Sequence, residues 1–328
     1  MKNIAIVILN WNGKDLLEKF LPSVTTYSQQ AKIYIADNNS TDDSVNFVTN
    51  NYPEITIIKN DINYGYAEGY NKALTHVNEP ILCLLNSDIE VTKNWLEPIE
   101  TIFNQNDSIA IVQPQILAYN SKNYYEYAGA AGGFIDKYGF AYCRGRIFDT
   151  LEIKDQYQSG QIFWASGACL FIKNETFKDL NGFDQHFFAH QEEIDLCWRA
   201  FNRNKKAYYC AESTVYHVGG ATLNQANPTK TYLNFRNNLC TLAKNLPKNK
   251  LFSVIFLRLC LDGIAGIRLF LQGKFSHTWA IMKSHFAFYK LLPNMLSKRR
   301  FPQREDYFQT KSIVYKYFIR KIKKFSNI

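Results

Sequence analysis

The sequence contains three short polar groups whose side chains could take part in chemistry. The first is Asn86-Ser87-Asp88, which directly follows the apolar run Ile81–Leu85. A carboxylate at the end of a buried strand is costly unless it has a partner, a proton or a metal. A tight turn would direct Asn86 and Asp88 toward one point, which suits a divalent cation held by carboxylate and phosphate oxygens. The alternative is that Asp88 only caps a helix that starts near Asn94.

The second group consists of Glu192, Glu193 and Asp195, three carboxylates within four positions. Helical spacing over residues 192–204 places them in a first helical turn, where acidic residues are common because that helix end is positive. Aromatic side chains precede and follow them, and carboxylates clustered beside apolar rings tend to include one with a raised pKa. Such a carboxylate is suited to act as a general base.

The third group is Val215–Gly220, which contains His217 after an expected strand. A lone histidine at such a position is more often structural than functional. If its imidazole lies near Asp88, however, it could complete a metal site.

Short apolar strands alternate with helices through the first 115 residues. The expected strands are residues 4–9, 33–36, 55–58, 81–85 and 109–112, and the expected helices are residues 16–21, 45–48, 67–77 and 95–103. This alternation is typical of an α/β fold with a mostly parallel sheet that has helices on both faces. A further strand is expected over 163–172. Residues 115–160 are rich in Tyr and Gly without clear periodicity, so we expect them to be irregular.

The predicted strands end in segments rich in Asn and Asp. These segments are residues 10–13, 37–42, 60–65 and 86–88. Asn, Asp and Gly are also ordinary turn residues, so any one segment has a structural explanation. Ligands of open parallel sheets bind at the carboxyl ends of the strands, and four polar ends at one edge therefore favour a ligand site.

The composition indicates a folded protein of a reducing compartment. Of the 328 residues 46% are hydrophobic and 15% aromatic, which is ample for a core. The seven cysteines are scattered without a CxxC pair, which argues against a disulfide framework. The apolar run near the N-terminus is too short for a signal peptide.

The basic charge is concentrated in residues 241–328, which hold 18 Lys and Arg against three Asp and Glu. The preceding residues hold 20 against 26, so the partner of this tail is expected to be anionic. The run 251–272 is apolar but interrupted by Arg258, Asp262 and Arg268, which favours an interfacial amphipathic helix over a transmembrane span. Later basic and aromatic clusters suit anionic headgroups. The alternative is that these helices pack against the rest of the chain; nucleic acid is a weaker candidate.

Several motifs occur in an order that resembles a known family. They are "IVILNWNG", "IADNNSTDDS", "NDINYGYAEGYNKAL", "LLNSDIEV", "ASGACLFIK", "FFAHQEEIDLCWR" and "VYHVGGAT". Together they resemble the family 2 glycosyltransferases of GT-A fold, in particular the rhamnosyltransferase-like branch. The resemblance covers residues 2–240. It implies a GT-A catalytic domain over 1–240, with a nucleotide-sugar half (1–115) and an acceptor half (116–240), followed by the basic helical tail 241–328.

The resemblance also implies roles for individual residues. Asn86-Ser87-Asp88 matches the metal-binding Asp-x-Asp motif with Asn in the first place, so Asp88 would hold Mg²⁺ or Mn²⁺ and His217 could add a ligand. Glu193 matches the catalytic base, with Glu192 and Asp195 as alternatives. The positions that match donor-binding residues are Asn10, Asp37, Asn39, Asn63, Gly65, Asn71, Asn86 and Ser87.

The function that follows from the resemblance is inverting transfer of a sugar to a glycan hydroxyl in the synthesis of a cell-surface polysaccharide. The expected donor is dTDP-rhamnose or, next, a UDP-sugar, and the expected acceptor is lipid-linked. The expected location is cytoplasmic, peripheral to the inner face of the plasma membrane, on its anionic surface. Two other classes remain as alternatives, a non-catalytic glycan- or membrane-binding module and a sugar-nucleotidyltransferase. The latter would need a Gly-rich phosphate loop where this chain has Asn10–Gly13.

Overall fold

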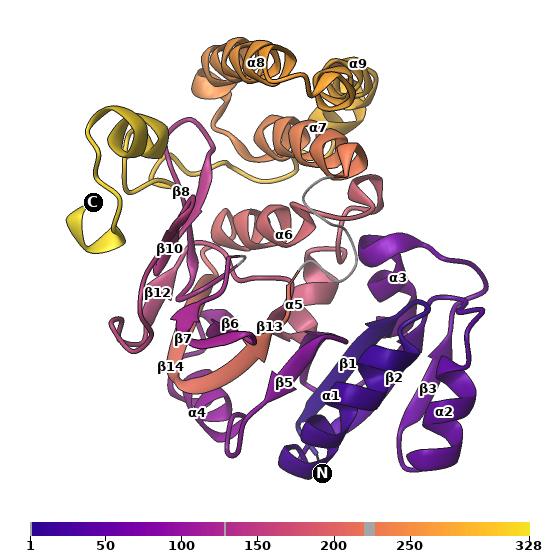
Figure 1. The fold of residues 1–328 in the computed structure, drawn as a ribbon. Helices are drawn as coiled ribbons and strands as arrows, with labels where there is room; N and C mark the ends of the chain where they lie inside the picture. The colour runs from indigo at the N-terminus through magenta and orange to yellow at the C-terminus, as the bar shows by residue number, and fades with distance from the viewer. Residues whose placement is uncertain (1, 128, 220–226) are drawn as a thin grey trace.

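The computed structural model describes residues 2–127, 129–219 and 227–328 (Figure 1). Ala128 and the last three residues of the "VYHVGGAT" motif, Gly220, Ala221 and Thr222, lie outside this description.

The first half of the chain has the predicted alternation of strands and helices. The strands are β1 (Ile4–Asn10), β2 (Lys32–Asp37), β3 (Thr56–Lys59), β4 (Ile81–Asn86) and β5 (Ile89–Val91); the helices are α1 (Lys14–Tyr27), α2 (Ser44–Asn51), α3 (Gly65–Leu74) and α4 (Glu97–Gln105). Continuous apolar runs form the buried strands, whereas residues at helical spacing bury one stripe of each helix. The α/β fold with a mostly parallel central sheet is confirmed.

The central sheet places the predicted polar strand ends in one row. Its strand order is β12-β14-β6-β13-β4-β1-β2-β3, with β1 parallel to both β2 and β4. In this register Asn10 lies opposite Asp37, and Leu9 lies opposite Asn86. The polar residues after these three strands therefore share one edge of the sheet.

Helices cover both faces of the sheet, and each face has its own core. Leu17 of α1 and Ile99 of α4 belong to one core cluster. Tyr70 of α3 and Trp198 of α6 (Glu192–Phe201) belong to the other. Strand residues alternate between the two clusters, as the two-residue period of a strand requires.

Residues 115–160 are not irregular as expected, because they contain strands of two sheets. In the central sheet β6 (Ile109–Ala118) pairs with β7 (Ser121–Tyr125) and with the long β14 (Lys206–His217). A second sheet consists of β8 (Gly133–Ile135), β9 (Ala141–Cys143), β10 (Arg146–Ile147) and β11 (Thr150–Leu151). The residues Gln113, Pro114 and Gln115 concealed the continuation of β6 beyond the predicted strand 109–112. Gln113 is fully buried and donates to the carbonyls of Gly129 and Ala130, and the pairing with β14 shifts register just after Pro114.

Three further elements complete the central region. They are β12 (Gly160–Ile162), β13 (Cys169–Lys173) and α5 (Asn174–Asp179). The strand expected over 163–172 is shorter than predicted, since Phe163 and Trp164 hydrogen-bond to Gly133 of the second sheet instead.

Three helices follow and form the upper layer in Figure 1, with α7 between the other two and the α/β body. They are α7 (Pro228–Asn245), α8 (Lys248–Leu271) and α9 (Phe275–Ser297). Residue 240, where we placed the end of the GT-A region, lies inside α7. In the described ranges no helix is long and apolar enough to cross a membrane.

The residues after α9 turn back and pack beside the second sheet (Figure 1). Phe325 stacks on Phe134, and the backbone N–H of Ile313 donates to Asp136 Oδ2 at 2.9 Å. Basic residues here also have partners within the protein, since Arg299 donates to two backbone carbonyls of the end of α7. This part of the tail therefore packs against the body, which is the alternative to membrane binding that we considered.

Candidate active site

The carboxyl ends of β1 and β2 carry a connected set of polar side chains. Asn10 Nδ2 donates to Asp37 Oδ1 at 3.2 Å and to Ser40 Oγ at 3.1 Å. The other oxygen of Asp37 accepts the backbone N–H of Ser40 at 3.0 Å. Asn10 and Asp37 are buried, and within the described residues Asn10 Oδ1 has no hydrogen-bond partner. A buried acceptor without a partner is costly, so this edge is suited to receive a ligand's donor group.

Gly13 and Ser87 extend this edge toward β4. A Cβ atom on Gly13 would lie 2.5 Å from Asn10 Oδ1, so the close approach of the backbone to that oxygen requires glycine. The same position is 3.8 Å from Ser87 Oγ. The Asn86-Ser87-Asp88 turn therefore lies beside the residues predicted to contact the nucleotide.

A second asparagine, Asn38, organises the loop before α3. Its Nδ2 donates to Asn63 Oδ1 at 3.1 Å and to the Gly65 carbonyl at 2.9 Å, and its Oδ1 accepts from Asn60 at 2.9 Å. Asn63 Oδ1 also accepts the backbone N–H of Gly65, whose φ of +72° favours glycine. Asn39 is exposed with a φ of +61°. The predicted donor residues Asn63 and Gly65 are thus held against the end of β2.

Asp88, His217 and Glu126 form a buried acidic group at the ends of β4 and β14. His217 Nε2 lies 3.2 Å from Asp88 Oδ1, and His217 Nδ1 lies 3.5 Å from Glu126 Oε2. Burial lowers the pKa of His217, but the neighbouring carboxylates of Asp88 and Glu126 outweigh it and raise that pKa to about 10. The two carboxylates therefore strongly favour a positive charge between them, which the protonated imidazole of His217 supplies.

This group fits a hard divalent cation in its donor chemistry. Carboxylate oxygens are the ligands that Mg²⁺ and Mn²⁺ prefer, and the three side chains are all buried. Over the described ranges, no three His, Cys, Asp or Glu side chains are grouped so that they could hold a metal by themselves. A cation here would have to share its coordination with oxygens of a bound ligand, as Mg²⁺ does with phosphates.

Glu192 and Glu193 form a carboxylate pair at the start of α6, with Glu192 buried and Glu193 half-buried. The Oε2 atom of each is buried and has no hydrogen-bond partner in the described part of the chain. Burial, and then the charge of Glu193, raises the pKa of Glu192 well above its ordinary value. Burial also raises the pKa of Glu193 to about 7. Both carboxyl groups therefore keep their protons to a higher pH than ordinary glutamates do, and Glu193 ionises near pH 7.

The residues Gly167 and Ala168 connect this pair to the turn that carries Asp88. A Cβ atom on Gly167 would lie 3.9 Å from Glu193 Cβ. The Ala168 carbonyl accepts the backbone N–H of Asn86 at 2.9 Å, and the Tyr66 hydroxyl donates to the Gly167 carbonyl at 2.7 Å. The glutamate pair and the Asn86-Ser87-Asp88 turn thus flank the same short segment.

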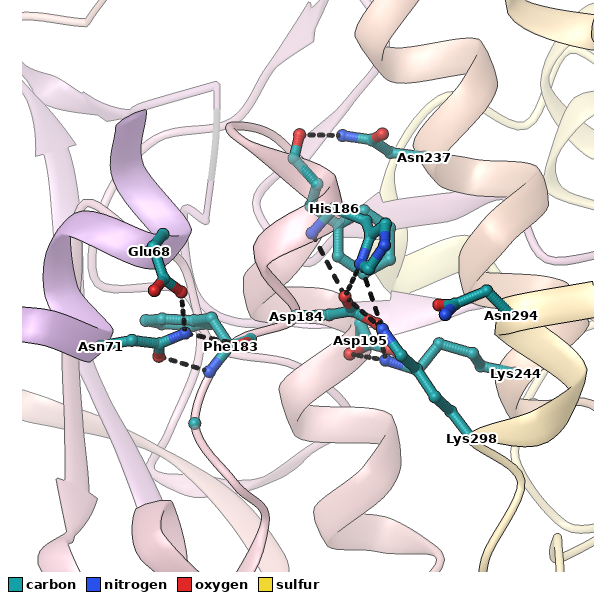
Figure 2. A network of polar contacts seen from close by, with 12 residues as sticks. Glu68, Asn71, Phe183, Asp184, His186, Asp195, Asn237, Lys244, Asn294 and Lys298 are labelled. Carbon is teal, nitrogen blue, oxygen red and sulfur yellow. Dashed lines mark hydrogen bonds and ion pairs between the residues drawn. The ribbon is translucent and has the colours of Figure 1, made fainter. Parts of the chain in front are cut away.

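Asp195, the third predicted carboxylate, is instead part of a buried ion-pair network (Figure 2). Asp195 Oδ2 lies 2.8 Å from Arg199 Nε and 2.8 Å from Lys244 Nζ. Lys244 also pairs with Asp184 at 2.8 Å, and Lys298 of the segment after α9 reaches Asp184 at the same distance. Burial alone would raise the pKa of Asp195, but Arg199 and Lys244 outweigh it and lower that pKa. Asp195 is therefore held in structural ion pairs, which favours the two glutamates as the candidates for the predicted base.

The loop immediately before the glutamates has an unusual backbone that α7 holds in place. Phe188, His190 and Gln191 have φ values of +64°, +69° and +73°, and each such non-glycine conformation costs about 1–3 kcal/mol. The fully buried Asn237 of α7 faces this loop, and its Nδ2 lies within 3.0 Å of three loop carbonyls, those of Phe187, Ala189 and His190. Arg236 donates to Asn237 Oδ1 at 2.8 Å and so fixes the orientation of the amide.

Asn71, expected among the donor residues, anchors the other side of this loop. Its side chain makes two hydrogen bonds to the backbone of Phe183, at 2.8 and 2.9 Å, and Figure 2 shows this contact between α3 and the loop. It does not hydrogen-bond to the Asn10 and Asp37 edge.

Sequence reasoning missed Glu126, Asn38, Asn237 and Lys244. Glu126 lies in the Tyr- and Gly-rich stretch, whose lack of periodicity marks no single residue. Asn38 belongs to an Asn-rich strand end and was detectable as one of that group. Asn237 and Lys244 lie in an ordinary helical pattern, and nothing in their neighbourhood marks them as partners of residues about 50 positions away.

Comparison with known proteins gives relatives of one functional type. The chain is 23% identical over 258 residues to a low-salt glycan biosynthesis hexosyltransferase of Haloferax volcanii, covering 77% of this chain and 78% of the relative. It is 20% identical over 247 residues to an N-acetylglucosaminyl-diphospho-decaprenol L-rhamnosyltransferase of Mycobacterium tuberculosis, covering 65% and 75%.

A solved structure agrees in fold. The chain resembles a mannosyltransferase from Pyrobaculum calidifontis in complex with GDP-Man and Mn²⁺, with a TM-score of 0.51, 13% identity and coverage of 90% and 86%. The model of the family described as "Glycosyl transferase family 2" matches residues 5–179, more than half of the chain. Since the matched segment spans β1 to α5, with the Asn10, Asp37 and Asp88 positions inside it, this chain belongs to glycosyl transferase family 2.

Proposed function

We propose that this glycosyltransferase moves a sugar from a nucleotide-diphosphate donor to a hydroxyl group of a lipid-linked glycan, with inversion at the anomeric carbon. One observation carries the proposal. An acidic group that fits a divalent cation and a glutamate pair, whose buried Oε2 atoms have no hydrogen-bond partner among the described residues, flank the same segment at one edge of the sheet. A metal-assisted displacement needs these two parts close together.

The donor would lie along the ends of β1, β2 and β4. Asn10 and Asp37 would face the nucleobase, while the loop of Asn63 and Gly65 would cover the nucleotide. Asp88, with His217 beside it, would hold the divalent cation against the diphosphate. When bound, that cation would stabilise the negative charge on the leaving nucleoside diphosphate as a Lewis acid.

Glu193 would act as the general base of a single displacement. The acceptor oxygen forms a bond to the anomeric carbon while the bond to the diphosphate breaks, and the hydroxyl proton passes to Glu193. A pKa near 7 suits this role, because the carboxylate is ionised at neutral pH yet still basic. Glu192, with its higher pKa, would keep its proton and limit the pair to one negative charge.

The relatives support the classes of donor and acceptor. The mycobacterial rhamnosyltransferase is named for a decaprenol-diphosphate-linked acceptor, and the Pyrobaculum calidifontis mannosyltransferase was solved with GDP-Man and Mn²⁺. We therefore propose a polyprenyl-diphosphate-linked acceptor, with dTDP-rhamnose as the first donor to test and UDP-hexoses as the next.

The proposal is tested by donor binding and transfer in the purified protein and in Asp88→Asn. Nucleotide sugars with Mg²⁺ or Mn²⁺ should raise the unfolding temperature of the wild type, because a ligand that binds the native state stabilises it. Asp88→Asn should lose the metal-dependent part of this rise and about 10²-fold or more of the transfer rate. Asp107→Asn, which changes an exposed carboxylate, is the matched control. Unchanged metal-dependent binding and transfer in Asp88→Asn would contradict the proposal.

A further inference from the structure

The helices α8 and α9 expose large apolar side chains along one stripe each. At helical spacing, α8 exposes Phe252, Phe256, Ile264, Ile267 and Leu271, and α9 exposes Phe275, Trp279, Met282, Phe286 and Tyr289. The exposed fractions reach 84% for Phe252, 80% for Leu271 and 69% for Phe286. Soluble proteins expose single apolar residues often, but a contiguous apolar surface of this kind marks an interaction site.

The polarity of α8 is reversed relative to an ordinary surface helix. Its buried residues include Arg258 and Asp262, whose side chains lie 3.9 Å apart, while its apolar stripe faces solvent. His285 of α9 contacts Asp262 at 3.3 Å, and Arg258 lies over the ring of Phe140. A surface helix normally buries its apolar side. In the hairpin formed by α8 and α9, the charged residues Arg258 and Asp262 thus pack inward, while large apolar side chains remain exposed.

The exposed charges around the two stripes all have one sign. Arg268, Lys274, Lys283 and Lys290 are exposed. Asp262 is the single acidic residue between Lys248 and Ser297, and it is buried against Arg258 and His285. The apolar surface is therefore bordered by cations without exposed carboxylates of its own.

We propose that the outer face of α8 and α9 docks on an anionic lipid surface, with the aromatic and aliphatic stripes in the headgroup boundary and the four cations on the phosphates. Interfacial helices insert their apolar side by about 5–10 Å, and each nearby Lys or Arg adds attraction to anionic lipid. Trp279 and Tyr289 are residue types that favour this boundary.

A second copy of this chain fits the same face less well. A two-fold dimer would bring the patch against itself, and its cations would meet cations. Lys is also depleted at the centre of protein interfaces, whereas here Lys283 lies next to Met282 in the exposed stripe. The charge pattern therefore favours lipid as the occupant.

The hairpin of α8 and α9 also lies near the proposed base, an inference that rests on the proposed function. The helix α7 lies between the hairpin and the body, and its Asn237 holds the loop before Glu192 (Figure 1). A helix with its side chains is about 10 Å across. A bilayer against the outer face of α8 and α9 would thus lie roughly two helix layers, about 20 Å, from the proposed base, a distance that a glycan attached to a membrane lipid can span.

The test is flotation of the full-length protein with vesicles of phosphatidylcholine alone and of phosphatidylcholine with 30% phosphatidylglycerol, at about 0.05 and 0.5 M salt. We expect binding to the anionic vesicles that weakens with salt. The double variant Leu271→Gln and Phe286→Gln should bind at least about tenfold more weakly, since each removes a side chain that would be buried in lipid. Lys283→Gln with Lys290→Gln should weaken binding to the anionic vesicles by about fivefold for each residue.

The matched control is Leu151→Gln with Ile153→Gln, which changes two exposed apolar residues, 47% and 53% exposed, outside the hairpin. It should bind like the wild type. The proposal is overturned if the protein does not float with anionic vesicles, or if the control and the hairpin variant bind equally. It is also overturned if light scattering shows a dimer that the hairpin variant dissociates while vesicles capture neither form. Because no step of the test needs turnover, a failure of the transferase proposal would leave its result unaffected.

Discussion

Replacing Glu193 by Gln should remove transfer activity and, above neutral pH, make the folded protein more stable. Gln has nearly the same shape as Glu but carries no charge. Burial raises the pKa of Glu193 from 4.5 to about 7, so the folded chain holds this proton more tightly than the unfolded chain does. Between these two pH values the folded state binds more protons. The free energy of unfolding of the wild type must therefore fall as pH rises through this range.

The size of the effect follows from the shift. A displacement from 4.5 to about 7 corresponds to at most about 3 kcal/mol, all of it present above pH 7 and nearly none below pH 4.5. Since Gln does not titrate, the stability difference between Glu193→Gln and the wild type should grow by about 2 kcal/mol from pH 5 to pH 8. Over the same range kcat of the wild type should rise with pH and level off above about 7.

The assay is urea unfolding at unit pH steps from 5 to 8, paired with transfer kinetics at pH 7.5. Glu193→Gln should lower kcat by about 10²-fold or more without changing the Kd of the donor nucleotide. Glu175→Gln, an exposed glutamate on α5, should match the wild type in both measurements. A stability difference that does not change with pH would refute the buried-pair reasoning. If Glu192→Gln is inactive and Glu193→Gln is active, the base is Glu192.

Two further perturbations test how the C-terminal helices hold the site. Asn237→Ala should lower kcat at least about tenfold, because the loop before Glu192 loses the hydrogen bonds that hold it. The donor Kd should stay unchanged, since the Asn10 edge is not altered; equal losses in kcat and in donor affinity would contradict a positioning role. Lys244→Met leaves the buried Asp184 and Asp195 with one cation fewer, and urea unfolding should show a loss of about 3–5 kcal/mol. Lys93→Met, at an exposed position, should show almost none.

The first half of the fold was predictable because its signals are local. Each strand from β1 to β4 is one apolar run, and each ends in polar residues that a parallel sheet must bring to the same edge. The pairing of β1 with β2 and β4 then places Asn10 opposite Asp37 and Leu9 opposite Asn86. This register follows from the strands themselves and not from distant parts of the chain. The donor edge could therefore be proposed from the sequence alone.

The rest could not be predicted because its signals depend on distant partners. Gln113 broke the apolar pattern of β6, yet it is satisfied by backbone atoms of residues 129, 130 and 166. Asp195 looked like a possible base, and only the approach of Lys244 on α7 shows that it is an anchor. Both cases involve buried polar groups whose partners are fixed by tertiary packing rather than by spacing.

Because the residues after α9 pack on the body, deleting them would affect more than membrane contact. A truncation after α9 would remove Lys298 from Asp184, Arg299 from the end of α7, and the residues that cover the second sheet. Asp184 begins the segment that leads into Glu192 and Glu193. Such a deletion would therefore disturb the loop before these two glutamates together with any membrane contact. Loss of activity after truncation would therefore not distinguish lost lipid binding from a disturbed loop. Substitutions at exposed residues of α8 and α9 separate the two effects, because those side chains face solvent. Surface substitutions there should change vesicle binding while the urea unfolding midpoint stays constant, and a shifted midpoint would show that the stripe stabilises the fold instead.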